Sequence, residues 1–468
     1  MIEKRLLEET FRLAASYLEG LTERPVGARD SIENLRARLR VPLSELGSPP
    51  ASVVRELARD VDGGLVASAG PRYFGFVTGG SLPAALAADW LTSAWDQNAV
   101  LSIASPAAGV VEETVSDWIL ELLDLPRESS VGFVTGCQMA NFTCLAAARH
   151  EVLRKAGWDV EASGLFGAPP ITVIAGEEAH ATLFVALRML GLGADRVIRV
   201  PADGQGRMDP GALQEALEGV SGPVIACLQA GNVSTGAFDP CETLIPLARK
   251  KDAWVHVDGA FGLWGRLDSR LAAETAGIEE ADSWATDAHK WLNVPYDSGI
   301  AIVKNEAAHR ASMVLAAPYY IAAPDAVRDP SQWVPESSRR ARGFPLYAAI
   351  RSLGREGLAE MVKRHCRQAR LMADLLREDP RVEIENEVVL NQVLVRFLPE
   401  GGEGDIDAFN RKVTALVQEE GTCWAGGSTW KGRACMRISV SGWPTTDEDI
   451  RKSAKAIREV LARTPVSG

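Results

Sequence analysis

The sequence predicts an α/β protein with a large domain on a mostly parallel seven-stranded sheet and a small C-terminal α+β domain. From residue 131, seven short apolar runs alternate with helical stretches. Strands that alternate with helices form mostly parallel sheets covered on both faces. Beyond residue 361 the alternation is less regular, which indicates the smaller domain. A chain of 468 residues is long enough for two or three such structural units.

Residues 1–80 are predicted to form an N-terminal helical segment that joins two subunits. Apolar residues recur at helical spacing through 3–21, so one face of this helix is apolar. A helix so early in the chain has little of its own domain to pack on. Either a subunit contact or core packing would cover that face. Residues 22–80 are rich in Pro and Gly and predict loops between short helices.

Residues 81–360 are predicted to form the large domain. Its first part looks helical, with a break at 105–109 and an amphipathic helix over 110–125 that Pro126 ends. The expected strands lie at 132–135, 171–175, 196–200, 224–229, 254–258, 283–287 and 299–304. The expected helices among them lie at 138–155, 180–190, 209–219 and 241–251.

A proline-rich stretch, 316–345, follows the last of these strands. A loop of this length in a compact enzyme is often a lid over an active site. A helix is expected at 346–378. Residues 361–468 are predicted to form the small domain. Its expected strands lie at 388–397 and 434–441, and its expected helices lie at 405–420 and from Asp447 onward.

The composition excludes some classes of function. The net charge is −12 and the isoelectric point is about 5.2. Nucleic acids and anionic membranes favour basic surfaces, so neither is an expected partner. Seven cysteines without a Cys-x-x-Cys pair, and six histidines without ligand spacing, predict neither a disulfide framework nor a metal site. The N-terminus lacks a signal-peptide core, and no run could span a bilayer, so we expect a cytoplasmic protein.

Lys290 and Asp258 carry the strongest chemical signal. Asp258 ends the strand WVHVD, and Lys290 follows a later strand in the motif DAHKW. A lysine amine forms an imine with the aldehyde of pyridoxal 5′-phosphate (PLP). A carboxylate at the pyridine nitrogen keeps that nitrogen protonated, so that the ring can accept electrons. Together the two residues predict a PLP enzyme.

Other strand ends add candidates for the same site. Gly136 separates a strand from a helix, and such helix N-termini bind phosphate. His180 starts another helix, where its ring could stack on the cofactor or make an ordinary hydrogen bond. His256 shares a strand face with Asp258, where it either supports the site or is a core histidine. Tyr319 and Tyr320 lie in the proline-rich stretch, as lid proton donors or as packing residues.

With these residues, the chain resembles the PLP-dependent group II amino-acid decarboxylases, which include the aromatic-L-amino-acid, tyrosine and glutamate decarboxylases. The resemblance runs from about Pro71 to Trp443. It is carried by SPAAGVVEETVSDWI, TGCQMANFTCLAAAR, AHAT, GRMDPGAL, AGNVSTGAFDP, WVHVDGAF and DAHKWLNVPYDSG. It implies a fold type I PLP enzyme that works as a homodimer with shared active sites.

The resemblance also implies a role for each residue of the site. Lys290 would form the imine, Asp258 would pair with the ring nitrogen, and His180 would stack on one ring face. Tyr320, with Tyr319 as the alternate, would return a proton to the α-carbon. The implied cofactor contacts are Gly136, Cys137, Gln138, His180, Asn232, Asp258, Ala260, Asp287, His289 and Lys290. The implied substrate contacts are Thr78, Phe76 and Arg437.

Three features depart from the family's pattern. The phosphate loop carries bulky Gln138 and Met139. Asp287 stands where the animal enzymes have Asn, and because a carboxylate repels a phosphate dianion we expect it to orient His289. The segment 72–79 is one residue shorter than in the aromatic decarboxylases and lacks a second Tyr, which argues against a catecholamine-type substrate.

The resemblance implies decarboxylation of an L-amino acid to the amine and CO₂, through the Lys290 imine and a quinonoid intermediate. Two alternatives stay open. The same scaffold could serve another PLP reaction, as an aldehyde synthase, a C–C or C–S lyase, or a transaminase. The chain could also be a catalytically silent homologue, although the set Lys290, Asp258, His180 and Tyr320 is complete.

Overall fold

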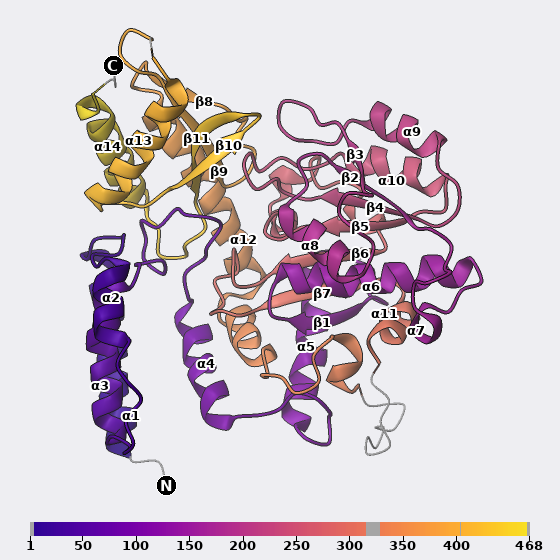
Figure 1. Ribbon diagram of the computed structural model, residues 1–468, viewed down its shortest axis with the longest axis horizontal. Helices are drawn as coiled ribbons and strands as arrows, with labels where there is room; N and C mark the ends of the chain where they lie inside the picture. The colour runs from indigo at the N-terminus through magenta and orange to yellow at the C-terminus, as the bar shows by residue number, and fades with distance from the viewer. Residues whose placement is uncertain (1–3, 315–327, 403, 466–468) are drawn as a thin grey trace. The chain divides into compact units, whose positions relative to one another are not determined.

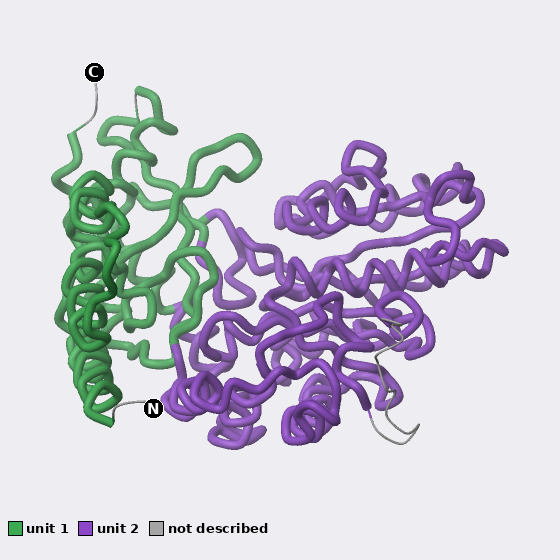
Figure 2. The backbone as a smooth tube through the Cα atoms, turned by 60° about the horizontal axis from the view of Figure 1, so that its bottom comes forward, with its two compact units in different colours: residues 1–80, 371–384, 394–468 green, residues 81–370, 385–393 purple. Residues whose placement is uncertain are grey.

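The structure is a computed structural model that describes residues 4–314, 328–402 and 404–465 (Figure 1). It divides into two compact units (Figure 2). Unit 1 comprises residues 1–80, 371–384 and 394–468. Unit 2 comprises residues 81–370 and 385–393. The sequence suggested three regions, whereas the structure has two units. The N-terminal segment and most of the C-terminal region together form unit 1.

Unit 2 contains the expected seven-stranded sheet. Its strands are β1 Ser130–Val134, β2 Thr172–Gly176, β3 Ile198–Val200, β4 Val224–Gln229, β5 Trp254–Asp258, β6 Ser283–Asp287 and β7 Gly299–Val303. They lie in the order β1-β7-β6-β5-β4-β2-β3. Neighbouring strands are parallel, except that β7 is antiparallel to both β1 and β6. The prediction of a mostly parallel sheet is confirmed.

Helices surround this sheet (Figure 1). They are α4 Pro83–Trp95, α5 Pro106–Leu122, α6 Cys137–Lys155, α7 Val160–Ser163, α8 Ala181–Met189, α9 Pro210–Glu218, α10 Cys241–Arg249, α11 Glu306–Met313 and α12 Gly343–Leu376, which continues into unit 1. Helix α6 packs on β5, β6 and β7. Its buried face includes Ala140, Cys144 and Ala148, and such small side chains let a helix approach a sheet closely.

Helix α5 begins earlier than the sequence suggested. The expected break at 105–109 is the first turn of the helix, with Ser105 at the N-cap and Pro106 next. A proline fits there, because the first N–H groups of a helix have no partner within it. The pattern SPAAG was therefore a start signal and not a break.

Unit 1 contains the small α+β fold, which is confirmed as well. Its strands are β8 Val382–Ile384, β9 Gln392–Phe397, β10 Gly426–Trp430 and β11 Arg433–Ser439, in the order β10-β11-β9-β8. Helix α13, Ile406–Glu420, packs on β11, and α14, Asp447–Arg463, packs on α13. A capping box between Thr446 and Asp449 begins α14 and satisfies the N–H groups of its first turn.

Three N-terminal helices complete unit 1 and lie side by side (Figure 1). They are α1 Lys4–Glu19, α2 Ile32–Leu39 and α3 Pro50–Val61. None of the three has a buried residue. Apolar side chains on α1 and α3 stay about half exposed, including Leu7 at 57%, Phe11 at 58% and Leu57 at 56%. An apolar face of this kind is typical of a surface that a partner covers.

Candidate active site

One edge of the unit 2 sheet gathers most of the predicted cofactor residues. Strands β2, β4, β5 and β6 are parallel, and β1 runs the same way because both β1 and β6 are antiparallel to β7. Their carboxyl ends therefore meet at one edge, which is where open α/β sheets bind ligands. The residues at or just after these ends are Gly136, Cys137, His180, Asn232, Asp258, Asp287 and Lys290.

Asp258 ends β5 and is 5% exposed. Asn141 Nδ2 donates to its Oδ2 at 3.0 Å, and the Ala260 N–H donates to its Oδ1 at 3.1 Å. Burial raises the pKa of the Cys137 thiol well above its usual value, with Asp258 adding to the effect. The thiol therefore keeps its proton and donates to Asp258 Oδ1, with the two atoms 3.4 Å apart. These three donors hold the carboxylate in one orientation and offset its loss of water.

Lys290 lies three residues after Asp287. Its Nζ is 2.9 Å from Asp287 Oδ2, and its side chain is 23% exposed. Burial opposes the charge on the amine, but Asp287, together with the other acidic groups nearby, outweighs burial, and the pKa of Lys290 lies above its usual value. The amine is therefore protonated and anchored at neutral pH. It must lose its proton before it can attack an aldehyde.

The turn between β1 and α6 is a tight cradle at the N-terminus of a helix. A Cβ built on Gly299 would lie only 2.4 Å from the Cα of Gly136, so backbone passes against backbone here. A Cβ on Gly136 itself would meet His289 Cε1 at 3.1 Å. The first amides of α6, at Cys137, Gln138 and Met139, have no carbonyl partner within the helix. A 19-residue helix beginning in such a turn fits a phosphate group.

Asp287 already occupies part of this cradle. It is 1% exposed, and its Oδ1 accepts a hydrogen bond from the Cys137 amide at 2.6 Å. Its other oxygen binds Lys290. One carboxylate therefore joins the phosphate loop to the reactive lysine, which the sequence did not suggest.

His289 also contacts Asp287. Burial lowers the pKa of His289, so the ring is neutral at pH 7. Its Nδ1 accepts from the Ser298 amide at 3.1 Å, which leaves the proton on Nε2, 3.4 Å from Asp287 Oδ1. The ring also lies 4.5 Å from the ring of Tyr296, centroid to centroid. This arrangement supports the expectation that Asp287 helps to orient His289.

His180 and Asn232 are both held by local hydrogen bonds. His180 is the N-cap of α8, and its Nδ1 lies 2.7 Å from Thr182 Oγ1. Asn232 Oδ1 accepts from the amides of Ser234 and Thr235, at 2.9 and 3.2 Å, and so shapes the loop after β4. Its Nδ2 has only long contacts, 3.3 Å to Gln229 Oε1 and 3.4 Å to the Glu178 carbonyl. A weakly held amide of this kind can turn to a ligand.

Asn141 is a site residue that the sequence analysis missed. It lies on α6, one helical turn after Cys137, and is fully buried. The available signal was the single amide within residues 139–148, a stretch in which Thr143 is the other polar side chain. A polar side chain on a buried helix face needs a partner, and the partner here is Asp258.

The predicted substrate residues belong to unit 1. Phe76, at φ 57° and 61% exposed, stacks on Trp424 with ring centroids 5.7 Å apart. The Phe76 carbonyl accepts from Ser439 Oγ at 2.7 Å and from Arg437 at 3.4 Å. Burial lowers the pKa of Arg437, and its Nε has no hydrogen-bond partner in the described part of the chain. Thr78 is half-buried nearby in sequence. Tyr319 and Tyr320 lie outside the described residues.

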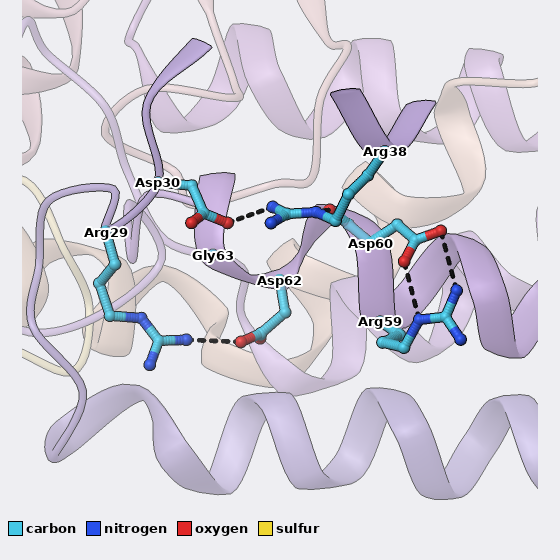
Figure 3. A pocket seen from close by; sticks show the side chains of 7 residues that line it. All are labelled: Arg29, Asp30, Arg38, Arg59, Asp60, Asp62 and Gly63. Carbon is cyan, nitrogen blue, oxygen red and sulfur yellow. Dashed lines mark hydrogen bonds and ion pairs between the residues drawn. The ribbon is translucent and has the colours of Figure 1, made fainter. Parts of the chain in front are cut away.

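Unit 1 also has a surface hollow of about 420 Å³ (Figure 3). It is lined by Arg29, Asp30, Arg38, Arg59, Asp60, Asp62 and Gly63. Each arginine already faces a carboxylate, as Arg29 does with Asp62 at 2.6 Å and Arg59 with Asp60 at 2.7 Å. The charges are balanced within the hollow, so we assign it to the packing of the N-terminal helices and not to catalysis.

Among the residues that the structure describes, every helix is too short or too polar to span a membrane. These residues also contain no group of three or more His, Cys, Asp or Glu side chains placed to hold a metal ion.

Comparisons with known proteins agree with this geometry. The family model of the pyridoxal-dependent decarboxylase conserved domain matches residues 33–398. Tryptophan decarboxylase 1 of Oryza sativa subsp. japonica is 27% identical and covers 97% of this chain and 92% of its own length. Phenylacetaldehyde synthase of Arabidopsis thaliana is 25% identical, and the match covers 83% of this chain and 81% of the synthase.

A solved structure shows the same fold. The crystal structure of Oryza sativa TDC with PLP and tryptamine superimposes with a TM-score of 0.91 at 24% identity, over 98% of this chain and 97% of that one. The residues at the sheet edge suit the same cofactor, with a lysine, a buried carboxylate and a helix N-terminus at neighbouring strand ends. The chain therefore belongs to the pyridoxal-dependent decarboxylase family, enzymes that are carboxy-lyases with PLP as cofactor.

Proposed function

We propose that this enzyme decarboxylates an L-amino acid to the corresponding amine. The proposal rests on two groups at neighbouring strand ends. Lys290, after β6, is anchored by Asp287. Asp258, at the end of β5, is a buried carboxylate held by three donors. PLP, when bound, supplies an aldehyde and an electron-accepting ring. The chain's own residues then have to hold that group, orient the amino acid and deliver protons.

Most of these roles would fall on residues of the sheet edge. Lys290 would hold the cofactor aldehyde and release it to the incoming amine. Asp258 would keep a proton at the ring nitrogen, and His180 would lie against the ring. The first turn of α6, with His289, would bind the phosphate. Tyr320, or Tyr319, would return a proton to the α-carbon after CO₂ has left.

The proposed substrate contacts are residues of unit 1. The Phe76 ring is exposed and stacks on Trp424, so it offers an apolar surface that suits an aromatic or aliphatic side chain. Arg437 has a donor without a partner and would suit a carboxylate. Thr78 would contact the α-carboxylate. The similarity to a tryptophan decarboxylase favours aromatic amino acids as the first substrates to test.

Aldehyde synthesis on the same scaffold is the second candidate. A relative with 25% identity is named a phenylacetaldehyde synthase. The two reactions share their first steps and differ in whether the α-carbon receives its proton before another reactant intervenes. The tyrosines at positions 319 and 320 favour simple decarboxylation.

Product analysis separates these reactions. The PLP-loaded protein is incubated with each common amino acid, and with sulfinate and hydroxyl analogues. CO₂, amine, aldehyde and keto acid are then measured together. We expect CO₂ and amine in equal amounts from one class of amino acid. Aldehyde or keto acid without amine would support another PLP reaction, and no product from any compound would support a silent homologue.

Replacing Asp287 with Asn should strengthen cofactor binding. The carboxylate lies beside the helix N-terminus that would hold a phosphate dianion, and an amide removes that repulsion. We expect the ratio of the pyridoxal to the PLP dissociation constant to rise about tenfold, or ~1.4 kcal/mol. Pyridoxal is the matched ligand because it lacks the phosphate. An unchanged ratio would show that Asp287 and the phosphate do not interact.

The same variant should change the pH dependence of cofactor uptake. Lys290 attacks only as the neutral amine, and Asp287 holds its pKa above the usual value, so uptake by the apoenzyme should quicken as pH rises. Asp287→Asn removes the anion that stabilises the ammonium. The rate profile should therefore move to lower pH. A shift to higher pH would contradict this assignment.

The homodimer is proposed on the N-terminal helices. The half-exposed side chains of Leu7, Phe11 and Leu57 on α1 and α3 suit a second copy of this chain. The double variant Phe11→Asp and Leu57→Asp should elute as a monomer in gel filtration and lose activity. Phe166→Asp, at 98% exposure and outside residues 1–80, is the matched control and should stay dimeric. A fully active monomer would refute shared active sites.

A reducing compartment such as the cytoplasm suits this chain. All seven cysteines are unpaired and buried. Burial raises the pKa of Cys144 and Cys423 to about 12, so these thiols are protonated and unreactive at neutral pH.

A further inference from the structure

A chain of buried side chains leads from Asp258 into the core of unit 2. Asn141 Nδ2 donates to Asp258 Oδ2 at 3.0 Å, and Asn141 Oδ1 lies 2.8 Å from His256 Nε2. His256 Nδ1 lies 3.0 Å from Ser283 Oγ. Trp254 Nε1 in turn donates to Ser283 Oγ at 2.9 Å. Four hydrogen bonds thus connect β5, β6 and α6 behind the carboxylate.

The fold itself places these groups together. Trp254, His256 and Asp258 alternate along β5 and so point to one face of the sheet. Ser283 of β6 pairs directly with His256 and points to the same face. Asn141 comes from α6, which packs on this face. All but Trp254 and Asp258 are 0% exposed, and those two are 5% exposed, so water does not compete for the bonds.

The hydrogen positions along the chain follow from the acceptors. Carboxylate Oδ2 of Asp258 can only accept, so Asn141 presents its NH₂ there and its Oδ1 to His256. Asn141 Oδ1 can only accept, so His256 carries its proton on Nε2. Burial lowers the pKa of His256 to about 4, so the ring is neutral and its Nδ1 accepts the Ser283 hydroxyl proton. The donor and the acceptor of each hydrogen bond in this chain of side chains are therefore determined.

This arrangement also determines which atom of Asp258 is left for the cofactor. Oδ1 already accepts from the Ala260 amide and the Cys137 thiol. Oδ2 accepts from Asn141 and keeps one further lone pair. Without the Asn141 contact, the Asp258 carboxylate could rotate and offer either oxygen to the cofactor. It would then hold a proton on the ring nitrogen less well.

We infer that Asn141 and His256 are positioning residues that hold Asp258 so that its Oδ2 faces the ring nitrogen of the cofactor. They act only through Asp258 and touch no reacting atom. The inference rests on the proposed cofactor site. It accounts for a buried amide and a buried neutral histidine that the chemistry of Lys290 does not use.

The test compares two ligands of equal shape. PLP presents a ring nitrogen to Asp258, whereas 1-deaza-PLP has carbon at that position and needs no proton there. Dissociation constants for both are measured by tryptophan fluorescence, for the wild-type protein and for Asn141→Leu and His256→Leu. We expect each variant to weaken PLP about tenfold more than 1-deaza-PLP, because a positioned charged hydrogen bond is lost only with PLP.

Two further variants separate positioning from damage to the fold. His256→Gln keeps one donor and one acceptor and should retain more of the preference for PLP than His256→Leu. His309→Leu is the matched control, because His309 is also a buried histidine, bonded to Ser130 at 2.8 Å and to the Trp333 carbonyl at 2.9 Å. It should leave the ratio of the two dissociation constants unchanged.

The outcomes distinguish this inference from the proposed function. Variants at Asn141 and His256 that weaken PLP and 1-deaza-PLP in parallel would overturn the positioning role and leave the cofactor site standing. If His309→Leu changed the ratio of the two dissociation constants as much as His256→Leu does, the positioning role would be overturned as well. Wild-type protein that binds neither ligand would overturn both the inference and the proposed function.

Discussion

Lys290→Ala should abolish CO₂ release, with a loss of about 10⁴-fold or more, equivalent to ~5.5 kcal/mol of transition-state stabilisation. Lys290 is the residue at this sheet edge whose amine can form an imine with an aldehyde, once it has lost its proton to the surroundings. Without it the cofactor has no covalent anchor. Release of CO₂ is measured with the substrate found by product analysis, under PLP saturation.

Lys290→Arg distinguishes covalent chemistry from the ion pair. Arginine keeps the positive charge next to Asp287 and so preserves the contact that anchors the loop, but it cannot form a bond to an aldehyde at neutral pH. We expect Lys290→Arg to fold as stably as the wild type and to be as inactive as Lys290→Ala. Activity in Lys290→Arg above a few per cent would contradict the proposed role of Lys290.

Asp258→Asn should lower the rate of decarboxylation about 10³-fold, or ~4 kcal/mol. An amide has the size of the carboxylate but cannot hold a proton on the ring nitrogen as a charged partner can. It would also place its own NH₂ against one of the donors that now converge on Asp258. The turnover number should fall while PLP still binds, which absorbance of the bound cofactor can verify.

Asp239→Asn is the control for that variant. Asp239 is another buried carboxylate of unit 2, and it accepts from the amides of Met208 and Gln229 at 2.7 and 2.8 Å. Its replacement should cost stability but leave the cofactor absorbance unchanged. Equal losses of activity in both variants, with equal loss of stability, would show that Asp258 matters only for folding.

The sheet of unit 2 could be predicted because its signals are local. The strands are short apolar runs, β1 to β4 are each followed by a helix, and every expected strand from 132 to 304 lies within a few residues of an observed one. Several short elements were missed, among them the four-residue helix α7. Helix α11 has eight residues, and its only start signal was Asn305, which caps it through the Ala308 amide. Strand β8 has three residues and depends on β9. Strand β10, GGSTW, has weak strand propensity and is held by β11.

For the active site, too, local signals could be predicted from the sequence and contacts between distant segments could not. Asp258 and Lys290 could be predicted because each carries its chemistry in its own side chain, next to a recognisable strand. The contact of Asp287 with Cys137 could not, because it joins residues 150 positions apart. The contact of Asp287 with Lys290, only three residues away, depends on how the turn after β6 folds. Asn141 was missed, and His256 was left open between a supporting and a core role. Their importance depends on which helix covers which strands, and that is a property of the folded sheet.

The most direct test of the central claim is reductive trapping of the cofactor. The PLP-loaded protein is treated with borohydride, digested, and analysed by mass spectrometry. We expect one modified peptide, with the pyridoxyl phosphate group on Lys290 and none on Lys304 or Lys251. A label on another lysine, or none after PLP has bound, would contradict the assignment of this sheet edge as the active site.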